Sequence, residues 1–291
     1  MDRAIGHGDM RKIAHIVHPV VVDASSDLHV AQPITFETMR AAREFAAGQV
    51  QVEHLYTKYA DETPPIPEGF QGTPDLERSV WDIATFRHRR KLALIKDILD
   101  RLYEATDAEY LIYTNVDIAL MPCFYAAVDR LIDRGYDALI INRRTISGVF
   151  QRLEDIPLMA AQIGEQHKGY DCFVFRRDAY PNYQLEDACV GTGRIGAVLA
   201  VNLIYNASKF KEFRDLHLTF HLGNDKIWKS NRFADYFSHN ENALKKVLQH
   251  YNVLQDPRDC PIVGQLIGQY GSGRDKLRYA LKRRLRALGG A

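Results

Sequence analysis

The feature that most constrains the fold of this chain is a repeated alternation of short apolar runs with longer amphipathic segments. Apolar runs of strand length occur at 12–19, 51–57, 110–114, 136–142, 169–175 and 216–222. Between them, apolar spacing of three and four residues predicts helices at 35–45, 87–103, 122–134 and 193–205. Such alternation is typical of βαβ units, because a crossover helix returns the chain to a parallel strand. The sequence therefore predicts an α/β fold with an open, twisted, mainly parallel sheet flanked by helices.

Composition narrows the class of protein. The 38 basic and 37 acidic residues nearly cancel, which excludes the broad positive field of a nucleic-acid-binding protein. The 4 cysteines are widely spaced, and no apolar run approaches the roughly 20 residues that span a bilayer. We therefore expect a cytoplasmic protein with one catalytic domain over 1–265, followed by a basic amphipathic helix or tail over 266–291.

A polar triplet, Asn115-Val116-Asp117, directly follows the strand predicted at 110–114. In open α/β sheets, ligands bind at the carboxyl ends of the strands, where this triplet would lie. Asp117 could hold a divalent cation that neutralises a leaving diphosphate, while Asn115 bonds sugar hydroxyls. The same spacing also fits a turn in which the side chains bond only their own backbone. The triplet alone leaves both possibilities open.

Four segments in order resemble one group of enzymes. They are N-V-D-I at 115–118, G-Y-D-C-F-V-F at 169–175, G-R-I-G at 193–196 and a late histidine, His221. The set resembles the motifs of GT-A-type nucleotide-diphospho-sugar glycosyltransferases, over about residues 12–228. The resemblance implies a GT-A-like fold, a nucleoside-diphosphate-sugar donor, and Mg²⁺ or Mn²⁺ as cofactor.

The resemblance also implies roles for single residues. Asp117 would bind the metal, and His221 would add a second metal or phosphate contact unless it makes a structural hydrogen bond. Asp171 would face the sugar or the acceptor, or else the backbone of a neighbouring strand. His18 at the end of the first strand, and Gln32 in the loop expected over 27–34, would contact the nucleotide base or ribose.

The sequence departs from the family pattern after G-R-I-G. Related proteins continue with Trp-Asp, whereas this chain has Ala197 and Val198, so an expected acid is absent. The nearby pair Glu186-Asp187 makes Asp187 the candidate catalytic base, although acids at a helix start are also favoured by the helix dipole. Arg194 could bind the diphosphate or pair with Asp187.

Two basic segments remain. Residues 87–91 (RHRRK) lie at the start of a predicted helix, which suits a phosphate partner or a solvated face. The segment 274–288 repeats leucine on one helical face among lysines and arginines, which suits peripheral contact with the inner membrane surface. Packing of that leucine face on the body or on a second subunit is the alternative.

These features together predict a metal-dependent glycosyltransferase that moves a sugar from a nucleoside diphosphate to a hydroxyl acceptor. A non-catalytic protein that binds sugar nucleotides or glycans is an alternative, which the valine at 198 keeps open. A nucleotidyltransferase is disfavoured, since no glycine-rich phosphate loop follows the first strand.

Overall fold

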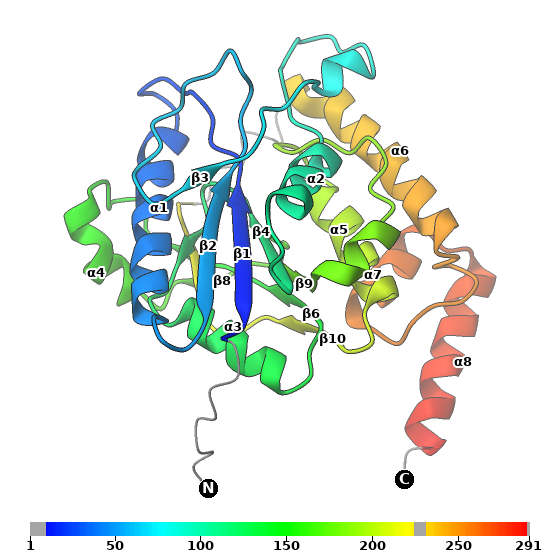
Figure 1. Ribbon diagram of the computed structural model, residues 1–291. Coiled ribbons are helices and arrows are strands. Elements are labelled where there is room, and N and C mark those ends of the chain that lie inside the picture. The colour runs from blue at the N-terminus through cyan, green and yellow to red at the C-terminus, as the bar shows by residue number, and fades with distance from the viewer. Residues whose placement is uncertain (1–9, 224–230, 290–291) are drawn as a thin grey trace, which may run out of the picture.

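The computed structural model describes residues 10–223 and 231–289, and its centre is a seven-stranded sheet (Figure 1). The strand order is β10 (Phe210–Phe213), β6 (Ala138–Ile141), β9 (Cys172–Arg176), β4 (Tyr110–Thr114), β1 (Lys12–Val17), β2 (Gln51–Tyr56) and β3 (Gln71–Gly72). Neighbouring strands are parallel except at β9, which is antiparallel to both β4 and β6. The predicted mainly parallel sheet is confirmed.

Helices cover both faces of this sheet. One face packs against α1 (Leu28–Phe45) and α3 (Phe124–Asp133). The other face packs against α2 (Ile95–Ala105), α5 (Ile195–Asn206), α6 (Ala234–His250) and α7 (Pro261–Tyr270). Successive β4 side chains point to opposite faces, so Tyr110 and Ile112 join the first core and Leu111 and Tyr113 the second. A strand buried on both faces is mostly apolar, which explains the run Tyr110–Tyr113, and the buried hydroxyl of Thr114 at its end contacts His15.

A smaller four-stranded sheet lies beyond the carboxyl end of β4. Its order is β5 (Ala119–Leu120), β11 (Thr219–Leu222), β7 (Arg144–Ile146) and β8 (Glu165–Gln166). The helix α4 (Ile156–Ala160) lies between β7 and β8 in the sequence. Short 3-10 turns occur at Val80–Asp82, Leu153–Asp155, Arg177–Asn182 and Asn231–Phe233. Since β5 follows β4 after a single turn, this sheet brings late parts of the chain next to the 115–118 turn.

Two predicted helix starts are wrong. The expected loop over 27–34 is helical, because α1 already begins at Leu28, whose backbone N–H donates to the carboxylate of Asp27 at 2.9 Å. Pro33 lies within this helix, where its missing N–H removes one helical hydrogen bond. Gln32 therefore projects from a helix and not from a loop.

The basic run at 87–91 lies outside α2, which begins only at Ile95. Two backbone N–H groups of this run donate to side chains of α6. The N–H of Arg87 donates to the Asp235 carboxylate at 2.7 Å, and the N–H of Arg90 donates to the Tyr236 hydroxyl at 2.8 Å. The helix-dipole argument for a phosphate at this run consequently no longer applies.

The chain ends in α8 (Gly273–Gly289), which projects from the body (Figure 1). Leu266 and Ile267 of α7 are buried in the core, so the body continues past the predicted boundary at residue 265. Within the described ranges, no helix combines the length and apolarity needed to cross a bilayer.

Candidate active site

Polar side chains from both sheets meet at the carboxyl end of β4. Asp117 lies on the turn after β4, and its Oδ2 is 3.2 Å from Nε2 of His221 on β11. The antiparallel pairing of β5 with β11, in which Ala119 opposes Phe220, places these two side chains side by side. The structure thus brings together the two residues proposed as metal ligands from positions 104 apart in the sequence.

The ring orientation of His221 is fixed by a backbone carbonyl. Its Nδ1 lies 3.0 Å from the carbonyl oxygen of Gly223, which can only accept, so Nδ1 carries the proton. In the neutral ring, Nε2 then presents a lone pair towards the carboxylate of Asp117. Two electron-rich groups at this distance need a proton or a cation between them. A histidine that donates its other nitrogen to a backbone carbonyl is also the common arrangement in metal sites.

The carboxylate of Asp117 has one oxygen that can still bind a ligand. Its Oδ1 is buried and has no hydrogen-bond partner. Burial alone would raise the pKa of Asp117, but a protonated His221 beside it, through its hydrogen bond and its charge, and the charge of Arg143 leave it below its ordinary value. A divalent cation between the two side chains would take the place of that proton and leave the imidazole neutral. The group is thus a carboxylate with one unused oxygen.

This donor set fits a hard or borderline divalent cation. A carboxylate oxygen and a neutral imidazole suit Mn²⁺, and the carboxylate suits Mg²⁺. In the described part of the chain, no three histidine, cysteine, aspartate or glutamate side chains converge. Asp117 and His221 would supply two ligands and leave the other positions to a substrate and water.

Asn115 sits opposite the start of β9. Its Oδ1 accepts a hydrogen bond of 3.0 Å from the hydroxyl of Tyr113, so its side chain does not close the turn on its own backbone. The turn is closed instead by the backbone N–H of Ile118, which donates to the carbonyl oxygen of Asn115 at 3.1 Å. The Nδ2 group of Asn115 has no partner among the described residues and remains available.

Asp171 faces the same corner. It directly precedes β9, whose Cys172 pairs with Thr114, so Asp171 lies across from Asn115. Its two carboxylate oxygens are each 3.4 Å from a basic group, Oδ1 from Arg143 and Oδ2 from His167. Asp171 therefore faces side chains and not, as one alternative held, the backbone of a neighbouring strand.

Arg143 and His167 were not predicted as site residues. Arg143 follows β6 at the carboxyl end of the sheet, which is the same positional signal that identified Asp117. Its Nε is buried without a hydrogen-bond partner. His167 follows the two-residue strand β8, for which the sequence gives no clear signal.

The two residues predicted to contact the nucleotide are both engaged with backbone groups. Gln32 accepts the N–H of Val20 at 2.8 Å and donates to the carbonyl oxygen of Val20 at 3.0 Å. His18 is buried with Nδ1 2.9 Å from the carbonyl oxygen of Thr57, and burial lowers its pKa despite that contact. These hydrogen bonds fix the backbone that follows β1. The nucleotide contacts of His18 and Gln32 stay predictions.

Asp187 lies in a segment at the same end of the sheet. This segment pairs with the chain just before α2 through Leu94 and Cys189, and the backbone oxygen of Asp187 is 2.8 Å from Nε2 of His239. The carboxylate of Asp187 has no ion pair or hydrogen bond within the described ranges. The neighbouring Glu186 has a left-handed φ of 52° and pairs with Lys246 at 3.3 Å. The pair does not start a helix, so the helix-dipole explanation for these acids is wrong.

Arg194 and Val198 belong to α5 and its start. Arg194 pairs with Glu241 of α6 at 2.6 Å rather than with Asp187, and it also reaches Gln269 of α7. Its predicted phosphate contact stays a prediction. Val198 is fully buried in the core, so the position where related proteins place an acid serves packing in this chain.

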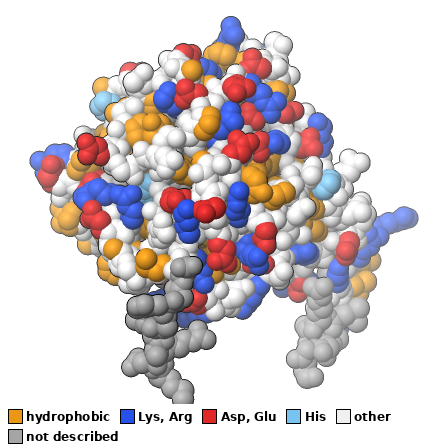
Figure 2. Space-filling model, viewed as in Figure 1, with side chains coloured by type: hydrophobic (Ala, Val, Ile, Leu, Met, Phe, Trp, Pro, Cys, Tyr) orange, Lys and Arg blue, Asp and Glu red, His pale blue; other side chains and the backbone are white. Residues whose placement is uncertain are grey.

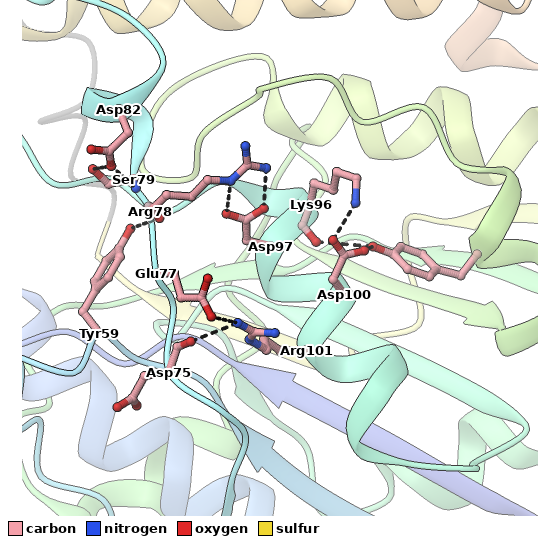
Figure 3. A network of polar contacts seen from close by, with 11 residues as sticks. Tyr59, Asp75, Glu77, Arg78, Ser79, Asp82, Lys96, Asp97, Asp100 and Arg101 are labelled. Atoms are coloured by element: carbon pink, nitrogen blue, oxygen red, sulfur yellow. Dashed lines mark hydrogen bonds and ion pairs between the residues drawn. The ribbon is translucent and has the colours of Figure 1, made fainter.

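A polar network joins the segment 75–82 to α2 (Figure 3). Arg78 donates from Nε and Nη2 to the two carboxylate oxygens of Asp97 on α2, both at 2.9 Å. These hydrogen bonds, and more weakly the charge of Asp187, raise the pKa of Arg78. Further along α2, Asp100 accepts from the Tyr180 hydroxyl at 2.6 Å. The network holds the segment before the basic run against α2.

Comparison with known proteins gives only distant similarity. No family model matches the chain, and no curated protein sequence matches it. Among solved structures, residues 1–349 of S. aureus TarS in complex with UDP-GlcNAc are 8% identical, with a TM-score of 0.46 over 83% of this chain and 73% of that one. Glucosyl-3-phosphoglycerate synthase from Mycobacterium tuberculosis, with Mn²⁺ and UDP-glucose, is 10% identical, with a TM-score of 0.44 over 83% and 80% of the two chains.

A nucleotide-diphospho-sugar transferase of unconfirmed activity from Desulfovibrio desulfuricans is also 10% identical, with a TM-score of 0.39 over 82% of this chain and 99% of that one. Similarity at these levels assigns no activity to this chain.

Proposed function

We propose that this protein is a metal-dependent glycosyltransferase that moves a sugar from a nucleoside-diphosphate sugar to a hydroxyl acceptor. One observation carries the proposal: Nε2 of His221 faces the carboxylate of Asp117 at 3.2 Å, and the other oxygen of that carboxylate is buried without a hydrogen-bond partner. The pair lies at the carboxyl end of an α/β sheet, where such folds bind ligands. The four ordered motifs of the sequence support the same activity.

Each side chain has a distinct task in this mechanism. Asp117 and His221 would hold the divalent cation, and the carbonyl of Gly223 keeps the His221 ring in the tautomer that this needs. When bound, the cation neutralises the charge that develops on the departing diphosphate. Asn115 offers its free Nδ2, and Asp171 a carboxylate oxygen, to the hydroxyls of the sugar. These contacts orient the anomeric carbon towards the acceptor.

The acceptor hydroxyl needs a base, and Asp187 is our candidate. Its carboxylate has no other partner in the described part of the chain, and it lies in a segment held by His239 at the same end of the sheet. As the acceptor oxygen bonds to the anomeric carbon, its proton passes to Asp187 and the diphosphate leaves with the electrons of the broken bond. The nucleotide base and ribose would lie near the end of β1, beside His18 and Gln32.

The test is calorimetric titration of UDP, GDP, CDP and dTDP into the protein, with and without Mn²⁺. We expect one nucleotide to bind in a metal-dependent way, and Asp117→Asn to weaken that binding at least about tenfold, since it removes a charged ligand without changing the side-chain size. Asp187→Asn is the matched control: it should keep nucleotide binding but lose sugar transfer. Equal binding by Asp117→Asn and wild type, or no binding of any nucleotide, would contradict the proposal.

Turnover separates an enzyme from a binding protein. A transferase slowly hydrolyses its preferred sugar nucleotide even without acceptor, because water can take the place of the acceptor hydroxyl. Binding without any release of nucleoside diphosphate by the wild-type protein would favour the non-catalytic alternative.

A further inference from the structure

The helix α8 is attached to the body along one face only. The hydroxyl of Tyr279 donates to the carbonyl oxygen of Cys260 at 2.9 Å, and Lys282 donates to Asp256 at 2.8 Å and to the carbonyl oxygen of Pro257 at 3.0 Å. At its start, Asp275 accepts hydrogen bonds from Ser272. Asp275, Tyr279 and Lys282 recur at four- and three-residue spacing, so they lie on one side of the helix.

The opposite side of α8 presents two exposed leucines that lie against no other element in the described part of the chain. Leu277 and Leu281 are 63% and 51% exposed, and they lie one helical turn apart. Together with the stems of Arg274 and Arg278, and with the stem of Lys282 at the edge of the attached face, they line a shallow apolar groove. Figure 2 shows basic and hydrophobic side chains together along this projecting helix. Most exposed leucines are isolated, whereas these two form a stripe.

The charge of this segment has one sign. Residues 276–291 contain 6 lysines and arginines and no aspartate or glutamate. Arg274 and Arg284 have no acidic partner within the described ranges. The exposed leucines of α8, bordered by Arg274 and Arg284, are complementary to a lipid surface that has negatively charged headgroups outside and hydrocarbon beneath. Two copies of α8 placed face to face would instead oppose like charges.

We propose that α8 docks the protein on an anionic lipid bilayer. Leu277 and Leu281 enter the boundary between headgroups and acyl chains, while Arg274 and Arg284 meet the lipid phosphates. The helix lies on the membrane and does not cross it, in keeping with the absence of a spanning helix in the described residues. The proposal concerns binding alone and does not depend on the proposed enzyme activity.

Flotation of the full chain with lipid vesicles tests this. We compare vesicles of phosphatidylcholine with vesicles that contain about a third phosphatidylglycerol. The protein should float only with the anionic vesicles, and the double variant Leu277→Gln/Leu281→Gln should bind at least about tenfold more weakly, since two leucines no longer leave water. The control Val21→Gln/Phe45→Gln changes two residues of similar exposure, 58% and 55%, and should bind as wild type does.

A second pair of substitutions tests the contribution of the positive charges of α8. Arg274→Gln/Arg284→Gln should weaken binding roughly 30-fold, and added salt should weaken wild-type binding, because both act on attraction to the anionic headgroups. Circular dichroism checks that each variant is folded. The proposal is overturned by equal binding to neutral vesicles, by unchanged binding of the leucine variant, or by no binding at all. A dimer in sedimentation that only the leucine variant loses would show that a second copy covers this face.

Discussion

A buried histidine offers a quantitative test of the core. His15 on β1 lies between the sheet and α3, with Nδ1 2.8 Å from the hydroxyl of Tyr125 and Nε2 2.9 Å from the hydroxyl of Thr114. The Tyr125 hydroxyl is also 3.0 Å from Nε2 of His54. No acid takes part in these contacts, and all four side chains are buried. The network suits neutral imidazole and has no counter-ion for a proton.

Burial lowers the pKa of His15 from 6.5 to about 3. Between these two values the unfolded chain binds a proton and the folded protein does not, so stability is complete above pH 6.5 and falls as the pH drops. One pKa unit corresponds to about 1.4 kcal/mol, so protonation of the unfolded state at about pH 5 costs roughly 2 kcal/mol from this residue. Burial lowers the pKa of His54 too, which acts in the same direction.

The assay is urea unfolding at about pH 7.5 and about pH 5 for wild type, His15→Gln and the control His29→Gln, which changes an exposed histidine. We expect His15→Gln to lower stability at the higher pH, yet to lose roughly 2 kcal/mol less than wild type between the two pH values. The control should keep the wild-type dependence. Equal pH dependence in wild type and His15→Gln would refute the reasoning, as would an NMR titration of the His15 ring near its ordinary pKa.

Two further predictions concern the carboxyl end of the sheet. Gln32→Ala should lower the free energy of unfolding by about 2 kcal/mol, since Val20 loses both backbone hydrogen bonds, and a loss below about 0.5 kcal/mol in urea unfolding would show that water replaces them. For Arg78 and Asp97, a double-mutant cycle with alanine should give a coupling of about 1 kcal/mol that weakens in salt, because the pair is bidentate while Arg78 is 44% exposed; a coupling of zero would make the pair dispensable for stability.

The sequence predicts those elements of the fold whose own residues determine them. The strand at Tyr110–Thr114 has the predicted bounds, because burial on both faces favours its four apolar or aromatic residues, Thr114 satisfies its hydroxyl on His15, and the polar triplet ends the strand. The strands β5 and β8 have two residues each and exist only through their pairing with β11 and β7, so no local pattern marks them. The sequence does not predict the start of α2 correctly, because Asp235 and Tyr236 of α6, far along the chain, bind the backbone of the basic run at 87–91 in a non-helical conformation.

The residues of the candidate site also differ in how far the local sequence predicts their place. Asp117 follows β4, so its position alone indicated the carboxyl end of the sheet. Asp171 precedes its strand and reaches the same end only because β9 runs antiparallel to β4, so its role came from the resemblance and not from its position. His221 was identified only through the resemblance, and its contact with Asp117 depends on the smaller sheet, which the sequence did not predict. Arg143 carried the same positional signal as Asp117 and was overlooked among other basic residues.

Two polar clusters in this protein differ in a way that bears on function. In the network on α2, both carboxylate oxygens of Asp97 bind Arg78, so the contacts close on themselves and a structural role suffices. At the carboxyl end of β4, buried oxygens of Asp117 and Asp171 and the buried Nε of Arg143 all lack hydrogen-bond partners. Buried polar atoms without a hydrogen-bond partner also occur elsewhere in the described residues, Arg101 Nε on α2 among them, so their absence of a partner alone does not mark a site. Three such atoms from three separate segments meet at the carboxyl end of the sheet, where α/β folds bind ligands, and this grouping supports the proposed site. The proposed donor substrate suits such a site, because its diphosphate can accept hydrogen bonds from a guanidinium, its cation can meet a carboxylate, and its sugar hydroxyls can both donate and accept.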